Sequence, residues 1–362
     1  MSDDWRTAAP GGTGAAEPAA GAGSGPPERR GAAPGPRQHR ADHVTDDSDA
    51  FIDLCASALS EDGLHHVAQY HWGVFNYSAD ILDRLPVPTE GSPAATDPAD
   101  RRRQFTRVGR QLHYVLGRMD HVLRSVDSGR LVRSVLQFGD GAVFHYYFRS
   151  DEYLTGFSLR ADTVDAGDRA MADLIAAFRE ELGLPFLNPG GFVTASCPSA
   201  ATPWAGSKEP HLVKEGDWGT PDPPVLARCA RAVAVNGLHY AGYFAPDTGH
   251  LTADVFNDPA LAGFFRTLSR DERRTRYVGL GERLHYVVAR LNQSLRAVVP
   301  GRLTRVVLDV EEGALFYADR GEGRFALGVS LDESQVARAD RRMTDLVHSL
   351  AAMTREERDE TR

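Results

Sequence analysis

The sequence contains a long internal repeat. Residues 105–178 align without a gap with residues 277–350, at a shift of 172, and about 27 of the 74 aligned positions are identical. Upstream, at a shift of 174, Gly63-Leu64-His65 returns as Gly237-Leu238-His239. Self-similarity at one spacing is typical of a duplicated domain. The chain of 362 residues is therefore expected to hold two related domains, each of roughly 130 residues.

Irregular segments flank the two copies. The first 48 residues are dominated by Ala, Gly and Pro and hold few large apolar side chains, so we predict that they are disordered. A second stretch, rich in Pro and Gly, separates the copies and is interpreted as a linker. The predicted organisation is a tail over 1–48, a first domain over 49–182, a linker over 183–224, a second domain over 225–355 and a charged tail over 356–362.

The apolar pattern predicts the same order of elements in each copy. In the first copy Leu112, Leu116 and Met119 recur at the spacing of one helix face, which indicates an amphipathic helix over 105–126. Its twin is expected over 277–298. A short helix and a hairpin precede this middle helix, and three strands and a closing helix follow it. We therefore predict an α+β fold with two copies of a helix-flanked, five-stranded antiparallel sheet.

Composition excludes several classes of protein. Acidic residues outnumber basic ones by 50 to 41, a net charge of −9, which argues against nucleic-acid binding. No run approaches the ~18 apolar residues that a membrane helix needs, so we expect no membrane span. The N-terminus begins Met1-Ser2-Asp3-Asp4 with no basic segment and no apolar stretch behind it, so we expect no secretory signal and a cytoplasmic location.

Residues that could carry chemistry are scattered along the chain. Six histidines fall in the first copy, but only His65 and His113 have counterparts in the second, which are His239 and His285. None stands beside a cysteine or a paired carboxylate at metal-ligand spacing, so we expect no metal site. No nucleophile, nucleotide-binding or metalloprotease motif occurs. We therefore expect no catalytic residue, no cofactor and no enzymatic activity.

Two hairpins of the second copy resemble those of the dynein light-chain roadblock family. Residues 237–249 look like that family's first hairpin, and residues 302–308 followed by 312–316 look like its central hairpin. Together with the order of elements, the resemblance covers about 49–180 and 223–355. It implies a non-catalytic scaffold that pairs through its middle helix and a sheet edge, and a protein partner such as a small Ras-like GTPase. It also implies that the two domains pair within one chain or in a homodimer.

Polar positions on the middle helices are the candidate partner-binding residues. They fall away from the apolar stripe and are polar in both copies, so the two middle helices are expected to form the contact face. Two alternatives come from other classes of protein: a small-molecule sensor with a pocket between sheet and helices, and an adaptor resembling a secretion chaperone. The candidate residues are His113, Arg118 and Arg124 in the first copy and His285, Arg290 and Arg296 in the second.

Overall fold

Both copies of the repeat fold into the same series of elements. The computed structural model describes residues 35–85, 97–192, 209–221, 223–296 and 301–360. The first half comprises β1 (Arg37–Arg40), α1 (Asp49–Ser57), β2 (His66–His71), β3 (Val74–Asp80), α2 (Pro98–Arg124), β4 (Leu131–Phe138), β5 (Gly141–Arg149), β6 (Glu152–Ser158) and α3 (Val164–Glu181). The second half comprises β7 (His211–Gly216), α4 (Pro224–Ala232), β8 (Tyr240–Ala245), β9 (Gly249–Asp254), α5 (Arg270–Leu295), β10 (Leu303–Val310), β11 (Gly313–Gly321), β12 (Arg324–Ser330) and α6 (Val336–Glu360).

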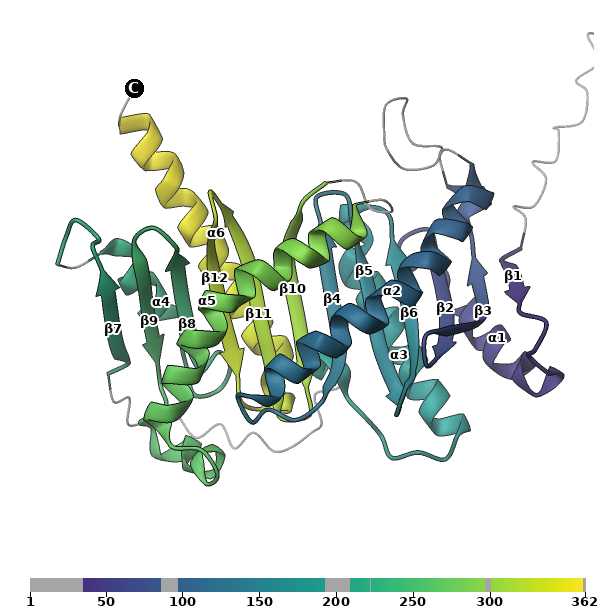
Figure 1. The fold of residues 1–362 in the computed structure, drawn as a ribbon, viewed down its shortest axis with the longest axis horizontal. Helices are drawn as coiled ribbons and strands as arrows, with labels where there is room; N and C mark the ends of the chain where they lie inside the picture. The colour runs from purple at the N-terminus through teal and green to yellow at the C-terminus, as the bar shows by residue number, and fades with distance from the viewer. Residues whose placement is uncertain (1–34, 86–96, 193–208, 222, 297–300, 361–362) are drawn as a thin grey trace, which may run out of the picture. The chain divides into compact units, whose positions relative to one another are not determined.

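One continuous antiparallel sheet joins the two halves (Figure 1). Its twelve strands run in the order β1-β3-β2-β6-β5-β4-β10-β11-β12-β8-β9-β7. The prediction of two separate five-stranded sheets is therefore wrong. Each half has a sixth strand, β1 or β7, and the inner edge strands β4 and β10 pair with each other. An uncovered edge would expose unpaired N–H and C=O groups, and the pairing of β4 with β10 removes two such edges.

The seam between β4 and β10 has two-fold symmetry. The two strands are antiparallel, and Val135 lies opposite Val307, its own counterpart at the shift of 172. Equivalent residues face each other where a two-fold axis passes between them, as in an isologous dimer. In this chain the two halves therefore make the pairing of a symmetric dimer within one molecule.

The two outermost strands come from segments that were expected to be irregular. β1 lies within the predicted tail and β7 within the predicted linker. β1 reads Arg-Gln-His-Arg and is largely exposed, so it lacks the apolar alternation that predicts a strand. Backbone pairing with β3 and β9 holds these strands in equivalent registers, because Arg37 lies opposite Asp80 and His211 opposite Asp254. Residues 1–34 of the predicted tail lie outside the described residues.

Helices cover both faces of the sheet. α2 and α5 lie on one face, and α1, α3, α4 and α6 lie on the other (Figure 1). α2 begins seven residues before its predicted start of 105, with Pro98 in its first turn, where proline is well tolerated. α2 and α5 contact each other, and Arg276 donates a hydrogen bond to the Ser125 carbonyl across 2.5 Å. The apolar side chains of both helices are buried in one shared core, which spans the seam.

The middle helices approach the sheet most closely at one glycine each. A Cβ at Gly109 would lie 2.3 Å from the Tyr70 hydroxyl oxygen, and one at Gly281 would lie 2.3 Å from Cζ of Phe244. No side chain fits in that space unless the aromatic ring moves. The glycines therefore set the distance between each helix and the buried aromatic residues of the sheet.

Replacing Gly281 by alanine is expected to destabilise the protein by about 1–3 kcal/mol, because the buried Phe244 ring must shift. Gly117→Ala is the matched control in a helix, since nothing lies within 4 Å of a Cβ at Gly117. There the better helix propensity of alanine should raise stability by about 1 kcal/mol. Urea unfolding of both variants measures the difference. Equal stability of Gly281→Ala and the natural protein would contradict the close approach.

Candidate functional site

The exposed faces of α2 and α5 carry the predicted partner-binding arginines. Each helix turns its apolar stripe toward the sheet, so its opposite face meets solvent. Arg118 and Arg290 lie on this face at equivalent positions, and both are exposed. Neither guanidinium makes a hydrogen bond or ion pair with another residue that the structure describes. Both charges are therefore available to a partner.

The two candidate histidines lie at the border between helix and sheet. His113 stacks on Tyr153 with a ring-centroid distance of 5.2 Å, and burial lowers the pKa of its imidazole. Its Nδ1 is buried and has no hydrogen-bond partner among the described residues. His285 is half-buried and meets Tyr286 edge to face at 5.6 Å. The histidines are thus less accessible to a partner than the arginines.

Two equivalent grooves open beside the C-terminal halves of α2 and α5, each with a volume of about 590 Å³. His113 and Arg124 line the first groove, and His285 and Arg296 line the second. Arg124 pairs with Asp120 at 2.8 Å, so its charge is already matched. The structure therefore brings two candidate residues of each half into one groove, while Arg118 and Arg290 stay on the exposed helix face.

Position 120 in the first groove also has a structural task. Asp120 Oδ1 accepts a hydrogen bond from the N–H of Leu131 at 2.7 Å, where β4 begins. Asn292 Oδ1 accepts the same bond from Leu303 at 3.1 Å, where β10 begins. Both side chains fix the start of a strand. The first groove consequently carries a carboxylate where the second carries a neutral amide.

Three exposed aromatic residues stand on this side of the molecule and were not predicted as contact residues. Tyr114 and Tyr286 are 66% and 71% exposed at equivalent positions of α2 and α5, and Trp72, in the turn between β2 and β3, is 61% exposed. Aromatic side chains of this kind are typical anchors at protein interfaces. A signal was present, because Leu-His-Tyr-Val is identical in both copies and its tyrosine falls off the apolar stripe.

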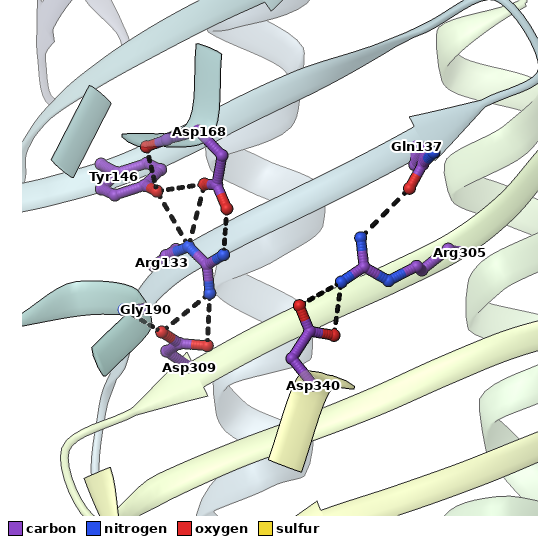
Figure 2. Close-up of polar contacts among 8 residues, drawn as sticks. All are labelled: Arg133, Gln137, Tyr146, Asp168, Gly190, Arg305, Asp309 and Asp340. Atoms are coloured by element: carbon purple, nitrogen blue, oxygen red, sulfur yellow. Dashed lines mark hydrogen bonds and ion pairs between the residues drawn. The ribbon is translucent and has the colours of Figure 1, made fainter. Parts of the chain in front are cut away.

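A buried charge cluster lies at the seam, where Arg133 of β4 stands between two carboxylates (Figure 2). Its Nη1 donates to both carboxylate oxygens of Asp309 in β10, at 2.8 and 2.9 Å, and its Nε donates to Asp168 of α3 at 3.1 Å. Tyr146 accepts from the same Nε at 2.8 Å, and the Gly190 N–H donates to Asp309 at 2.6 Å. Although burial opposes the charge, Asp168 and Asp309 raise the pKa of Arg133 well above its usual value.

The two-fold counterpart of this cluster is more open and carries one charge fewer. Arg305 of β10 pairs with Asp340 of α6 and donates to Gln137 of β4 at 3.1 Å (Figure 2). Gln137 occupies the position equivalent to Asp309. The side chains of Arg305 and Asp340 are 22% and 27% exposed, whereas those of Arg133 and Asp309 are 2% and 3% exposed. Both clusters connect the two halves, which indicates a structural role.

Buried histidines at the start of β2 and β8 also have structural partners. His65 Nδ1 accepts the N–H of Leu159 at 2.8 Å, so the proton sits on Nε2, which donates to the Glu61 carbonyl at 2.9 Å. His239 makes the same two bonds in the second half. Burial lowers the pKa of both imidazoles. These contacts fix each ring as the neutral tautomer.

Two free cysteines lie in the described ranges. Cys55 and Cys229 are fully buried, and burial raises the pKa of the Cys229 thiol to about 12 and that of Cys55 further. Both thiols therefore stay protonated and unreactive near neutral pH.

Among the described residues, no group of three or more His, Cys, Asp or Glu side chains could hold a metal ion. No helix of the described part is long and apolar enough to cross a membrane.

In comparisons with known proteins, no family model and no curated protein matches this chain. The exposed face of α2 and α5 is therefore the main guide to function.

Proposed function

We propose that this chain is a non-catalytic scaffold or regulatory protein that binds a protein partner on the exposed face of α2 and α5. One observation carries the proposal: Tyr114 and Tyr286 stand exposed at equivalent positions, and an exposed arginine follows each by one helical turn, Arg118 and Arg290. Tyrosine and arginine are enriched among the residues that dominate binding energy at protein interfaces. A small Ras-like GTPase is the partner class that the resemblance to roadblock domains implies, and this class rests on analogy of fold.

Photo-crosslinking tests the face directly. The photoreactive p-benzoylphenylalanine is placed at Tyr114 or at Tyr286, two exposed positions at which its additional benzoyl group can extend into solvent. His348, exposed on α6 across the sheet, is the matched control position. Native lysate is irradiated with GDP or with a non-hydrolysable GTP analogue, and crosslinked proteins are identified by mass spectrometry.

We expect one partner to crosslink at position 114 or 286 and not at position 348. Enrichment of a GTPase in one nucleotide state would support the regulatory role. Equal labelling at all three positions would contradict the proposed face. A partner that is not a GTPase would keep the scaffold function and reject that partner class.

The grooves beside α2 and α5 favour small-molecule sensing as a second candidate function. Each has a volume of about 590 Å³, which is within the range of ligand pockets. In the first groove, however, Arg124 is paired with Asp120 and Arg130 with Glu311, both at 2.8 Å. An anionic ligand would have to compete with these carboxylates. Native mass spectrometry of the purified protein distinguishes the two functions, since a retained small molecule would favour sensing.

A further inference from the structure

The exposed stripe of α2 is strongly basic. Arg107, Arg110, Tyr114, Arg118 and His121 follow one another at spacings of three or four residues, so they lie on one helix face, and all are exposed. The guanidinium groups of Arg107, Arg110 and Arg118 make no hydrogen bond or ion pair within the described part of the chain. Three uncompensated positive charges thus surround one exposed tyrosine, in a chain whose net charge is −9.

The equivalent stripe of α5 carries no net charge. Its residues at the same five positions are Gly279, Glu282, Tyr286, Arg290 and Gln293, in which one acidic and one basic residue cancel. Exposed Arg283 adds one positive charge to this face, and its Nε donates to the Gly279 carbonyl at 2.9 Å. The two helices have the same apolar face and the same glycine contact with the sheet. The fold therefore does not require the arginines of α2. A contact with a partner molecule would explain them.

A strained tryptophan stands beside the basic stripe. Trp72 and Gly73 are the two turn residues between His71 and Val74, and both have positive φ, 51° and 77°. Such a turn favours Asn, Asp or Gly, and a bulky side chain there is an outlier. The turn lies close to α2, since a Cβ at Gly73 would be 3.5 Å from the Tyr114 hydroxyl. Strain at an exposed ring points to a function for that ring.

We propose that the α2 stripe and Trp72 together bind an acidic segment of a protein partner, and that α5 does not bind the same segment. The proposal rests on the proposed function and specifies which half recognises the partner and by what charge. The arginines would meet carboxylates, and Tyr114 and Trp72 would take up apolar side chains between them. The two halves then present one strongly basic and one weakly charged docking helix.

A protein segment fits this surface better than a nucleic acid does. The backbone N–H of Trp72 donates a hydrogen bond to the Asp151 carbonyl at 2.9 Å, so acidic Asp151 lies next to this turn. Asp151 and the net charge of −9 disfavour a long polyanion, whose charges would extend beyond the basic stripe. A short acidic helix with an apolar side meets both the arginines and the aromatic rings.

The test uses a fluorescent 18-residue amphipathic peptide of Glu and Leu as the probe, with a Lys/Leu peptide of the same pattern as its control. Binding to the full chain is followed by fluorescence anisotropy at two salt concentrations. We expect the acidic peptide to bind and the basic one not to bind. Arg107→Glu/Arg110→Glu/Arg118→Glu should weaken binding about tenfold or more, because several opposite-charge contacts become repulsive.

Matched variants on α5 control for general charge effects. Arg118→Glu and Arg290→Glu make the same change at equivalent positions, and only the first should weaken peptide binding. Gly279→Arg/Glu282→Arg copies the stripe onto α5 and should raise the number of bound peptides. Circular dichroism and thermal unfolding show that each variant is folded.

Three outcomes would overturn the proposal. The first is equal weakening by Arg118→Glu and Arg290→Glu. The second is that a single-stranded oligonucleotide with the same charge as the acidic peptide binds more tightly than the peptide does, and loses affinity in the variants of the α2 arginines. The third is the same result with phosphatidylserine vesicles in place of the oligonucleotide. If the partner crosslinks at both Tyr114 and Tyr286 but the acidic peptide binds no better than the basic one, the proposed recognition of an acidic segment is rejected and the proposed function is kept. Loss of crosslinking at both positions would reject the proposed function itself.

Discussion

Replacing Arg133 by glutamine is expected to lower the free energy of unfolding by about 3–5 kcal/mol. The change leaves the carboxylates of Asp168 and Asp309 in the seam without their cation, and the Asp309 side chain is only 3% exposed. An unpaired buried charge costs far more than the ion pair itself contributes. Urea unfolding at pH 7, followed by circular dichroism, measures the loss.

Arg305→Gln is the matched control, because it makes the same change at the two-fold-related position. Arg305 faces one carboxylate, Asp340, and both side chains are more than a fifth exposed. Water can solvate the remaining carboxylate, so the expected loss is about 1 kcal/mol. Equal losses in the two variants would contradict the view that burial sets the cost.

The loss of unfolding free energy in Arg133→Gln should also depend on pH. Burial already raises the pKa of Asp309, against the opposing effect of Arg133. Without the arginine the folded protein favours protonated Asp309 more strongly, so the variant regains stability relative to the natural protein as pH falls from 7 to 5. A deficit that is constant over this range would point to lost packing instead of an unpaired charge.

Much of the local structure could be predicted because the repeat allowed each copy to check the other. The three strands expected after each middle helix are present as β4 to β6 and as β10 to β12. Periodicity cannot say which edges pair, however, because that depends on contacts between residues about 170 positions apart. The single sheet was therefore missed. β1 was missed because its residues are polar and its order comes from backbone pairing with β3.

The candidate site could be predicted in part. Arg118 and Arg290 are exposed as off-stripe residues, but Arg124 is paired with Asp120 and His113 packs on Tyr153. The cluster at the seam was not predicted. Aligning the sequence with itself at a shift of 172 matches Arg133 with Arg305, whereas in the structure the two-fold axis places Arg133 against Asp309. A signal existed, since Arg133 and its counterpart interrupt strands that are otherwise mostly apolar in both copies.

Lowering the pH from 7 to 4 is expected to destabilise the protein strongly through two buried histidines. Burial lowers the pKa of His66 to about 4 and that of His145 to about 3. The unfolded chain takes up protons on these residues below pH ~6.5, which the folded protein does not do until much lower pH. Stability is therefore lost as pH falls through this window. For His66 the full loss is roughly 3 kcal/mol, reached near pH 4.

The surroundings of His66 explain why its ring resists protonation. It meets Phe105 and Phe157 edge to face, at 5.2 and 5.5 Å, and neither ring nitrogen has a hydrogen-bond partner among the described residues. Asp80 favours the charged form, but Arg102, which pairs with Asp80 at 2.7 Å, opposes it. A proton on His66 would thus be buried among aromatic rings without a free counterion.

His145 is enclosed in a similar way. Its ring lies 4.3 Å from that of Tyr153 and 4.9 Å from that of Tyr147, and its Nδ1 is 3.4 Å from the Thr155 hydroxyl. Its Nε2 is buried without a partner in the described ranges. His113, the nearby titratable group, disfavours a second positive charge. The loss of stability from His145 should equal or exceed that from His66.

The repeat itself supplies the test variant, because the second half has Tyr240 and Tyr317 at the positions of His66 and His145. His66→Tyr/His145→Tyr should flatten the dependence of unfolding free energy on pH between 7 and 4.5. Since tyrosine is larger, His66→Gln/His145→Gln is made as well. Exposed His121→Gln is the control and should keep the natural slope. The comparison uses the slope of unfolding free energy against pH. A packing defect lowers the free energy by the same amount at every pH, so it does not change this slope. An unchanged slope in both double variants would mean that other groups carry the acid sensitivity.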